Sequence, residues 1–387
     1  MNPSDYTNLA VGRVVKHATG YHAFVPSPLP PKIEIDASLM VDLSRADAAL
    51  GELNGLARLL PNPHLLIAPL MRREAVSSSR IEGTRASLSD VLLDEAETES
   101  PSPSADIGEV RNYITALEHG LERLRTGGLP LSSRLVREMH ERLMHGVRGE
   151  HATPGEFRRS QNWIGPAGSS PVTAPYVPPP PEELPELLSN WEKFLHERDT
   201  LPDLVQCAIM HEQFEAIHPF LDGNGRIGRL LVTLFLIERQ RLTQPALYLS
   251  DYIEAHRQDY YDLLQRVRTH GDWASWLRFF LSCVTATARD AAERAGRIMD
   301  LREKYRGIVV DHAAGTALVD RLFVNPYLTV ARAMSVLSVT HPTASRAIVT
   351  LEKAGILKEV SGRRRGRIFL ATEILDALEQ PGPAARV

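Results

Sequence analysis

The sequence predicts a mainly α-helical protein that ends in a small helix-turn-helix module. Two observations support this class. From Asp36 onward, apolar residues such as Leu39, Leu43 and Ala46 recur at alternating four- and three-residue spacing, which is the period of an amphipathic helix. The same periodicity returns in most segments up to residue 305, and strands are expected only in two short stretches. A chain of 387 residues suits two or three domains.

Composition excludes several classes of protein. The hydrophobic share of 43% and the charged share of 24% are those of a soluble globular chain. The net charge of −4 creates no global field toward nucleic acid or membrane, so any such contact needs a local patch. Cys207 and Cys283 lie in apolar stretches, which indicates buried thiols and no disulfide framework. No long apolar run opens the chain, so we expect a cytoplasmic protein with no membrane contact.

The first domain is expected over residues 1–109. Prolines 26, 28, 30 and 31 predict an irregular, extended arm over residues 1–35. A helix follows from Asp36, and a second begins near Leu65 and ends at Gly83, whose freedom at positive φ suits a left-handed cap.

The second domain is expected over residues 110–305. Its helices are predicted from Val110, from Ser132, over 182–196, on both sides of the segment 218–229, and over 251–268 and 272–305. Between them, the polar stretch 155–181 predicts a short β-hairpin.

The third domain, residues 306–387, has the element order of a winged helix-turn-helix. We expect helices over Ala317–Phe323, Val330–Val336 and Thr343–Ala354, followed by two strands around SGRRRGR. Its expected core residues are Ala331, Val336, Ala344, Ile348 and Leu351. The arginines between these two strands, Arg363, Arg364, Arg365 and Arg367, would lie in the wing, where DNA phosphates are often contacted. Protein contacts or dimerisation, with the arginines in solvent, are the alternative, and a homodimer is left open.

The segment HPFLDGNGRIGR, residues 218–229, carries the clearest chemical signal. A glycine-punctuated turn opens directly into the apolar helix LLVTLFLIERQ, so free backbone N–H groups and the helix dipole would meet at one point. Gly223 and Gly225 let phosphate oxygens approach the backbone closely. The segment therefore predicts an anion site at a helix N-terminus.

Four side chains of the same segment add chemistry to that site. Arg226 and Arg229 are three residues apart on one helix face and can both bind a polyphosphate. Asp222 supplies the hard oxygen ligand that Mg²⁺ prefers. His218 is a base with an unperturbed pKa near neutrality. Taken singly, each could be an ordinary turn or surface residue, but together they supply a base, a metal ligand and a charge clamp.

This segment resembles the signature of the Fic domain, HPF-x-[D/E]-G-N-G-R-x-x-R, at every defining position. The resemblance extends over roughly residues 30–290 and implies a helical Fic fold with a β-hairpin flap near 160–176. It implies a nucleotidyltransferase that moves AMP from ATP, with Mg²⁺, to a Tyr, Thr or Ser hydroxyl of a protein, including the chain itself. His218 would be the general base, Asp222 the Mg²⁺ ligand, and Asn224 with Gly223 and Gly225 the anion hole, while Arg226 and Arg229 would hold phosphates. Tyr261 would border the adenine, unless it is a core aromatic.

A second signal lies in SSRIEG, residues 78–83. Glu82 falls in the last turn of a helix, where the helix dipole disfavours a negative charge, so a partner elsewhere is expected unless Glu82 is solvated. The segment resembles the inhibitory motif of Fic proteins, [S/T]-x-x-x-E-[G/N], with Ser78, Glu82 and Gly83 in the defining places. The resemblance implies autoinhibition through a salt bridge from Glu82 to Arg229. In some relatives the same Glu assists removal of AMP, so a reverse activity stays open.

The alternative function is a DNA-binding transcriptional regulator whose Fic site only senses nucleotide. The sequence names neither the target protein nor a DNA site.

Overall fold

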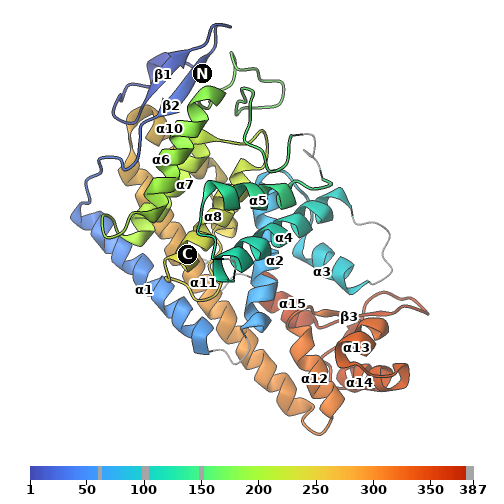
Figure 1. Ribbon diagram of the computed structural model, residues 1–387. Helices are drawn as coiled ribbons and strands as arrows, with labels where there is room; N and C mark the ends of the chain where they lie inside the picture. Colours follow the sequence, from blue (N-terminus) through green and yellow to red (C-terminus); the bar gives the residue numbers. More distant parts are fainter. Residues whose placement is uncertain (60–62, 98–103, 127, 148–151, 381–387) are drawn as a thin grey trace.

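The computed structural model describes residues 1–59, 63–97, 104–126, 128–147 and 152–380 (Figure 1). As predicted, the protein is mainly α-helical. The helices up to residue 308 are α1 (Ala37–Leu59), α2 (His64–Ile81), α3 (Leu88–Ala96), α4 (Ala105–Arg125), α5 (Ser133–Leu143), α6 (Leu184–His196), α7 (Asp203–Ile217), α8 (Asn224–Glu238), α9 (Ser250–Ala255), α10 (Arg257–His270) and α11 (Trp273–Ile308). In the described ranges, no helix is long and apolar enough to cross a lipid bilayer.

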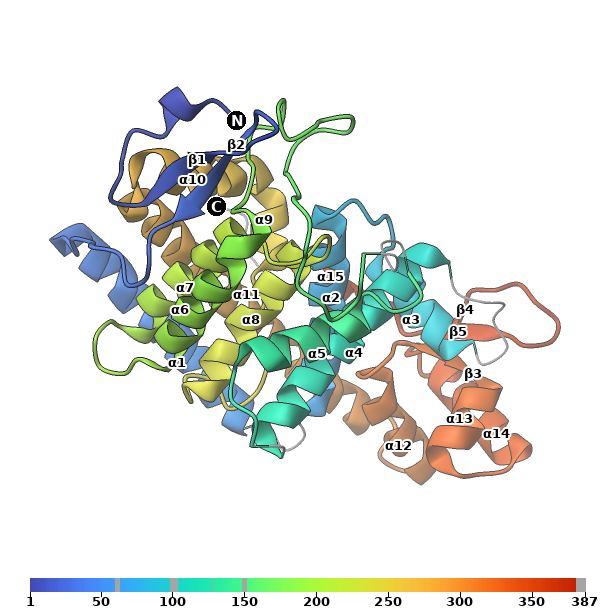
Figure 2. The ribbon, with the colours of Figure 1, turned by 45° about the horizontal axis from the view of Figure 1, so that its top comes forward.

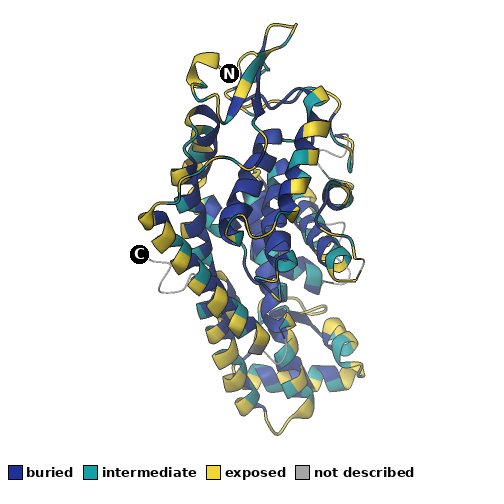
Figure 3. Ribbon diagram, turned by 60° about the vertical axis from the view of Figure 1, so that its left-hand side comes forward, coloured by how far each residue is buried: buried dark blue, intermediate teal, exposed yellow. Residues whose placement is uncertain are grey.

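Helices α7 and α8 form the centre of the body. Every residue of α7 from Leu204 to Ile217 is buried, and α8 is buried from Arg226 to Leu236. A helix that is buried on all sides must be surrounded by other elements. Helices α2, α4, α5, α6, α10 and α11 pack against this pair, and Figure 3 shows the buried residues gathered in the middle of the helical body. The junction between α7 and α8 is the segment 218–223, so the predicted site lies beside the buried centre of the fold.

The N-terminal arm differs from the prediction. Residues 1–35 were expected to be irregular, but β1 (Gly12–Lys16) pairs antiparallel with β2 (His22–Pro26). The prolines at 26, 28, 30 and 31 all lie at or beyond the end of β2, so none removes a donor from the ladder. The prediction was wrong because it spread the effect of these prolines over the whole arm.

The expected hairpin over residues 160–176 is present only as a loop closed by one bridge. The amides of Ile164 and Tyr176 donate to each other's carbonyls at 2.9 and 3.4 Å, and no regular strand forms on either side. Prolines 166, 171 and 175 remove backbone donors within this short stretch. Figure 2 shows the loop beside the N-terminal hairpin, and the Phe24 amide donates to the Val177 carbonyl at 2.9 Å. The β1–β2 hairpin therefore supports the loop from outside.

The C-terminal part follows α11, which runs without a break past the expected boundary at residue 305 to Ile308. The boundary itself stays a prediction. The elements are α12 (Ala313–Leu322), β3 (Tyr327–Thr329), α13 (Val330–Leu337), α14 (His341–Lys353), β4 (Lys358–Glu359), β5 (Ile368–Leu370) and α15 (Thr372–Glu379). The antiparallel sheet has the order β3-β5-β4. The three helices and two strands expected here are present, whereas β3 and α15 had no counterpart in the prediction.

One expected core residue of this part is misplaced. Ala331 is exposed, and Ala333 is buried in its stead. The Thr329 hydroxyl accepts the Arg332 amide at 3.1 Å and caps α13, which turns Ala333 toward the core.

The C-terminal part is docked on the body through α2 and α3. Arg73 of α2 donates to the Leu378 carbonyl at 2.9 Å, and Asn325 donates to the Leu92 carbonyl at 2.8 Å. Arg363, between β4 and β5, forms an ion pair with Glu97 at 2.6 Å. The helix that ends at Ser78–Ile81 is therefore in direct contact with the C-terminal part.

Candidate active site

The site begins where α7 ends. His218 caps that helix in the left-handed conformation, with φ 49° and ψ 60°, which costs a non-glycine residue about 1 kcal/mol or more. Two side chains hold its backbone in place. Arg158 Nε donates to the His218 carbonyl at 2.9 Å, and Asn162 Nδ2 donates to the same oxygen at 3.4 Å. The imidazole is thus presented from a strained but firmly held position.

Arg158 is a buried cation that ties several chain segments together. Besides His218, it donates to the carbonyls of Ser160, Pro179 and Ile217. Burial lowers its pKa to about 10, and the guanidinium remains charged at neutral pH. Arg158 therefore joins the loop 158–180 to the end of α7.

Asn224 shapes the turn that opens α8. Its Oδ1 accepts the Phe220 amide at 2.8 Å, and its Nδ2 donates to the Phe220 carbonyl at 2.9 Å. Gly223, just before it, has φ 77°, which favours glycine. Both ends of the Asn224 amide are thus used to close the loop 220–224, and this leaves the backbone of the helix N-terminus for an anion.

His140 of α5 contacts the same turn through its ring and both ring nitrogens. Its ring stacks on Phe220 with 3.7 Å between centroids, its Nδ1 accepts the Gly155 amide at 2.9 Å, and its Nε2 lies 3.0 Å from the Asp222 carbonyl. With Nδ1 as acceptor, Nε2 carries the proton and donates. Burial lowers the pKa of His140 to about 4, so the ring is neutral and matches this pattern.

Arg229 is held by the end of α2. Its Nε donates to the Ser78 hydroxyl at 2.8 Å, and one terminal nitrogen reaches the Ser78 carbonyl at 2.9 Å and the Glu82 carboxylate at 2.7 Å. The Arg229 side chain is 2% exposed and that of Glu82 is 31% exposed. The ion pair expected from the sequence is therefore present, and Ser78 belongs to it as well.

The Glu82 carboxylate lies against the first turn of α8. A Cβ placed on Gly225 would meet Glu82 Oε1 at 2.4 Å, so only glycine leaves room for this oxygen. Burial raises the pKa of Glu82, but the Arg229 charge opposes it and the net shift is downward. A charged carboxylate thus occupies the position at which an anion would approach the helix N-terminus.

Comparison with known proteins gives this geometry a family. Residues 40–122 match the profile described as Fic/DOC family N-terminal, and residues 130–236 match the profile described as Fic/DOC family. This part of the chain belongs to the Fic/DOC family. Its mainly helical architecture is the Fic fold, since a Fic family protein from Desulfovibrio desulfuricans G20 aligns with a TM-score of 0.57 at 21% identity, over 89% of this chain and 98% of that one. Fic-1 from C. elegans aligns with a TM-score of 0.52, over 68% of this chain and 74% of that one.

The relatives found by sequence are distant. A probable protein adenylyltransferase of Aquifex aeolicus (strain VF5) is 29% identical over 189 residues, which are 49% of this chain and 55% of that protein. A protein adenylyltransferase Fic of Aedes aegypti is 33% identical over 154 residues, 39% of this chain and 27% of its own length. The chain thus spans about half of the bacterial relative and about a quarter of the mosquito protein.

The other arginine of the Fic segment, Arg226, lies between two carboxylates. One terminal nitrogen is 3.6 Å from Glu109 Oε2 and the other is 3.8 Å from Asp222 Oδ1. Within the described part of the chain, its Nε and Nη1 form no hydrogen bond, although the side chain is buried. Glu109 also accepts the Thr84 hydroxyl at 2.7 Å. Arg226 therefore has donors to offer a phosphate.

Asp222 and Tyr261 are exposed members of the predicted site. The Asp222 side chain is 49% exposed, and its Oδ1 accepts the Gly223 amide at 2.6 Å. Tyr261 is 38% exposed and stacks edge-on against Tyr260, with 5.2 Å between ring centroids. Tyr261 is thus at the surface and is not a core aromatic; its role toward adenine stays a prediction.

The His218 ring differs from the expectation of a base near neutrality. Burial lowers its pKa to about 3, and the charges of Arg158 and Arg268 act in the same direction. The imidazole is therefore neutral at physiological pH and ready to accept a proton, although it is a weak base in this state.

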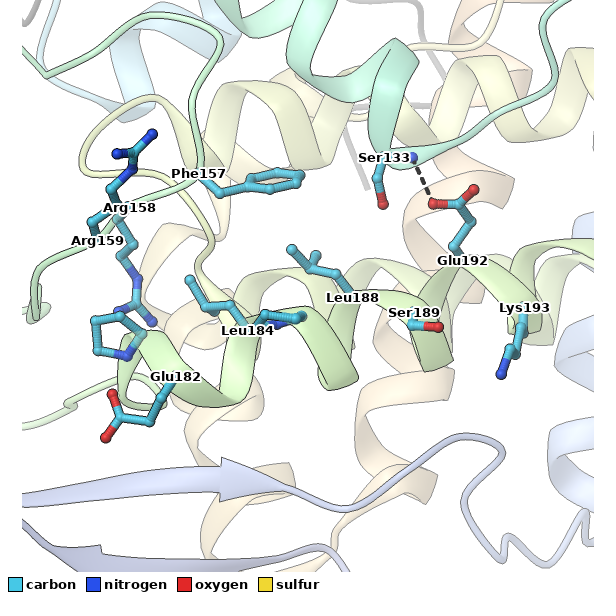
Figure 4. Close-up of a pocket in the computed structure, with 12 residues that line it drawn as sticks. Ser133, Phe157, Arg158, Arg159, Glu182, Leu184, Leu188, Ser189, Glu192 and Lys193 are labelled. Carbon is cyan, nitrogen blue, oxygen red and sulfur yellow. Dashed lines mark hydrogen bonds between the residues drawn. The ribbon is translucent and has the colours of Figure 1, made fainter.

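A separate groove of about 810 Å³ lies between α6, the start of α5 and residues 157–159 (Figure 4). Phe157 faces Leu184 and Leu188 of α6 across it, and the Ser133 amide donates to Glu192 at one end. None of the residues of the Fic segment lines this groove, so it is distinct from the candidate active site.

The sequence predicted the members of the site that follow one another along the chain. It did not single out Arg158, Asn162, His140 or Glu109, which come from other segments. Most of them stand among other polar residues in their own segments, so no local pattern selects them.

Proposed function

We propose that the chain is a protein adenylyltransferase, which moves AMP from ATP to a Tyr, Thr or Ser hydroxyl of a protein. The names of its distant relatives favour this reaction. The observation that carries the proposal is local: a neutral, largely buried His218 lies just before a glycine-rich helix N-terminus, and the first turns of that helix carry two buried arginines. A base, an anion cradle and two phosphate-binding cations are thus held within one turn and one helix.

The chemistry follows from these positions. The hydroxyl oxygen of the target attacks the α-phosphorus of ATP, and its proton passes to His218. The bond between the α-phosphorus and the bridging oxygen breaks, and pyrophosphate leaves with that oxygen. Arg226 and Arg229 stabilise charge on the β- and γ-phosphates, while the N–H groups at the start of α8 bind oxygens of the transferred group.

Asp222 fits a role in holding Mg²⁺. Its carboxylate is half exposed at the mouth of the site, and the described residues contain no group of three or more His, Cys, Asp or Glu able to hold a metal by themselves. Mg²⁺ in nucleotide enzymes is usually bound by one or two carboxylates together with substrate phosphates. When bound, it would neutralise charge on the phosphates.

Glu82 supplies autoinhibition in this proposal. It engages the arginine that the γ-phosphate needs, and its oxygen fills the space over Gly225. ATP can then bind only in a pose that lacks this contact. Whether the chain also removes AMP from its targets depends on what Glu82 does once it leaves Arg229.

The test uses the Glu82→Gly chain with ATP labelled at either the α- or the γ-phosphorus, in the presence of Mg²⁺ and a cell lysate. Transfer of AMP labels proteins, including the chain itself, from α-labelled ATP only. Labelling from γ-labelled ATP would instead show phosphate transfer, and labelling from neither would reject the proposed activity.

DNA is the proposed partner of the C-terminal part. Residues 363–367 are exposed between β4 and β5 and include four arginines, which suits contact with phosphates. If duplex binding responds to ATP while no protein is labelled, the chain is a nucleotide-sensing regulator and not a transferase.

A further inference from the structure

Glu215 lies one helical turn before His218 on α7, and both side chains have an unsatisfied polar atom. Among the described residues, Glu215 Oε1 and His218 Nδ1 form no hydrogen bond, although both atoms are buried. The other carboxylate oxygen, Oε2, is 4.0 Å from His218 Nδ1. Leaving a buried polar group unpaired typically costs about 1–3 kcal/mol, so both groups gain from a closer approach.

The neighbouring helix is shaped to admit the Glu215 carboxyl group. A Cβ on Gly228 of α8 would meet Glu215 Oε1 at 2.4 Å. The Gly228 carbonyl lies 3.0 Å from Nδ1 of His211, which fixes the backbone at this point. Any larger residue at position 228 would push the carboxyl group out of its place behind the base.

We propose that Glu215 is a positioning residue for His218: its carboxylate accepts a hydrogen bond from the protonated Nδ1 of the ring, which keeps Nε2 unprotonated for the attacking hydroxyl. The inference rests on the proposed function, because it assigns His218 the role of base. The 4.0 Å separation is longer than a hydrogen bond, so the proposal requires the two side chains to move closer. Hydrogen bonds of this kind are often long before substrate binds.

The charges around Glu215 connect the Glu215–His218 pairing to the Glu82–Arg229 ion pair. The ionisable groups around Glu215 or His218 come from several packed elements and include Glu82, Arg158, His211, Glu212, Arg229, Tyr260, Tyr261 and Arg268. Burial raises the pKa of Glu215 to about 7; Arg229 opposes this shift, and the Glu82 carboxylate adds to it. When Glu82 moves away, one raising influence disappears and Glu215 ionises more readily. An ionised Glu215 then makes His218 a stronger base.

The first test reads the His218 tautomer and does not depend on activity. Full-length Glu82→Gly protein with isotope-labelled histidine is compared by NMR with the same protein carrying Glu215→Gln or Glu215→Leu. The proton should sit on Nδ1 in the parent and in Glu215→Gln, which keeps an acceptor, and should shift toward Nε2 in Glu215→Leu. An unchanged tautomer in Glu215→Leu would overturn the proposal.

The matched control is Glu212→Gln, which removes a carboxylate from the same helix. Glu212 contacts Arg268 at 3.2 Å, so this change should leave the His218 tautomer as in the parent. Melting temperatures of all variants show whether they are folded. A tautomer that shifts equally in Glu212→Gln would mean that any loss of charge on α7 has the effect, and would reject a specific role for Glu215.

The second test is the pH dependence of AMP transfer in the same variants. In the parent, the rate should rise with pH as Glu215 ionises, with a midpoint below the value of about 7 that applies while Glu82 is in place. Glu215→Gln and Glu215→Leu should lose this rise and be about 10- to 100-fold slower at pH 8. An unchanged profile would overturn the proposal. If the parent transfers no AMP but the tautomer still shifts in Glu215→Leu, the proposed function is rejected and the Glu215–His218 pairing is retained.

Discussion

Replacement of Glu82 by glycine removes one of the three contacts that hold the Arg229 guanidinium. The two contacts to Ser78, at 2.8 and 2.9 Å, remain. Arg229 therefore keeps its place on α8, while its terminal nitrogen and the space over Gly225 become available to a phosphate. Most substitutions at a catalytic site lower activity, but this one should raise it.

The size of the gain follows from the burial of the pair. A hydrogen bond to a charged group contributes about 1.5–3 kcal/mol, whereas a solvent-exposed ion pair contributes no more than about 1 kcal/mol. The pair has one fully buried member and one that is 31% exposed, so we expect about 1–2 kcal/mol. A free-energy difference of that size changes an equilibrium by about 5- to 30-fold. Labelling should rise by the same factor, and the melting temperature should fall by only a few degrees.

The assay is intact-mass spectrometry after incubation with ATP and Mg²⁺, with AMP additions counted per chain. Glu82→Gly should gain additions, and Glu82→Gly combined with Arg229→Ala should not, because the second change removes the arginine that the first one frees. Glu82→Gln is the matched control for backbone flexibility and should give a gain close to that of Glu82→Gly. Equal labelling of the wild type and Glu82→Gly would mean that the end of α2 is structural and does not restrain the enzyme.

Four further outcomes are expected. His218→Ala should slow AMP transfer by about 10²–10⁴-fold while calorimetry still detects ATP binding. Transfer at a near wild-type rate would reject the assignment of His218 as the general base. Asp222→Ala should lose activity that added Mg²⁺ restores only in part, and full activity in EDTA would contradict the metal role. Alanine at arginines 363–365 should lower the slope of log affinity for duplex DNA against log salt by about one per lost phosphate contact; if the intact protein binds no duplex even at low salt, the module serves protein contacts. Burial lowers the pKa values of His140 and His211 to about 4 and that of His218 to about 3, below the unfolded value of 6.5. Their contribution to stability is present above pH 6.5 and is lost as the pH falls toward 4, so a melting temperature that is flat from about pH 7.5 to 5 would contradict it.

Apolar periodicity predicted most of the helices, because most of them bury one face, but α3 and α15 had no counterpart in the prediction. Periodicity was less reliable where the availability of backbone hydrogen-bond donors decides whether strands form. The bridge between Ile164 and Tyr176 is a single pair because nearby prolines remove donors, and the β1–β2 hairpin forms because prolines 26, 28, 30 and 31 of the arm lie at or beyond the end of β2. The cap at Thr329 turned α13 so that Ala333 is buried and Ala331 is not.

The candidate site divides in the same way. The segment from His218 to Arg229 is continuous, so its glycines and charges could be seen together in the sequence. Arg158 is 60 positions from the carbonyl that it holds, and no local pattern connects the two. Glu82 was an intermediate case, since its unfavourable place at a helix end indicated a partner but only the resemblance suggested which one. The low pKa of His218 comes from burial and from distant arginines, and it required the fold.

Gly225 has a consequence for how the site responds to its surroundings. The Glu82 carboxylate lies in the space that the missing side chain leaves, and it acts there as a ligand attached to the chain. The effective concentration of a tethered ligand depends on its tether, and here the tether is the end of α2. Any free anion must therefore reach a threshold concentration to displace Glu82, and occupancy changes gradually around that threshold. Gly83, directly after Glu82, has φ 100°, a backbone conformation that favours glycine. Strain introduced there, for example by Gly83→Ala, would lower the threshold without altering either charge of the pair.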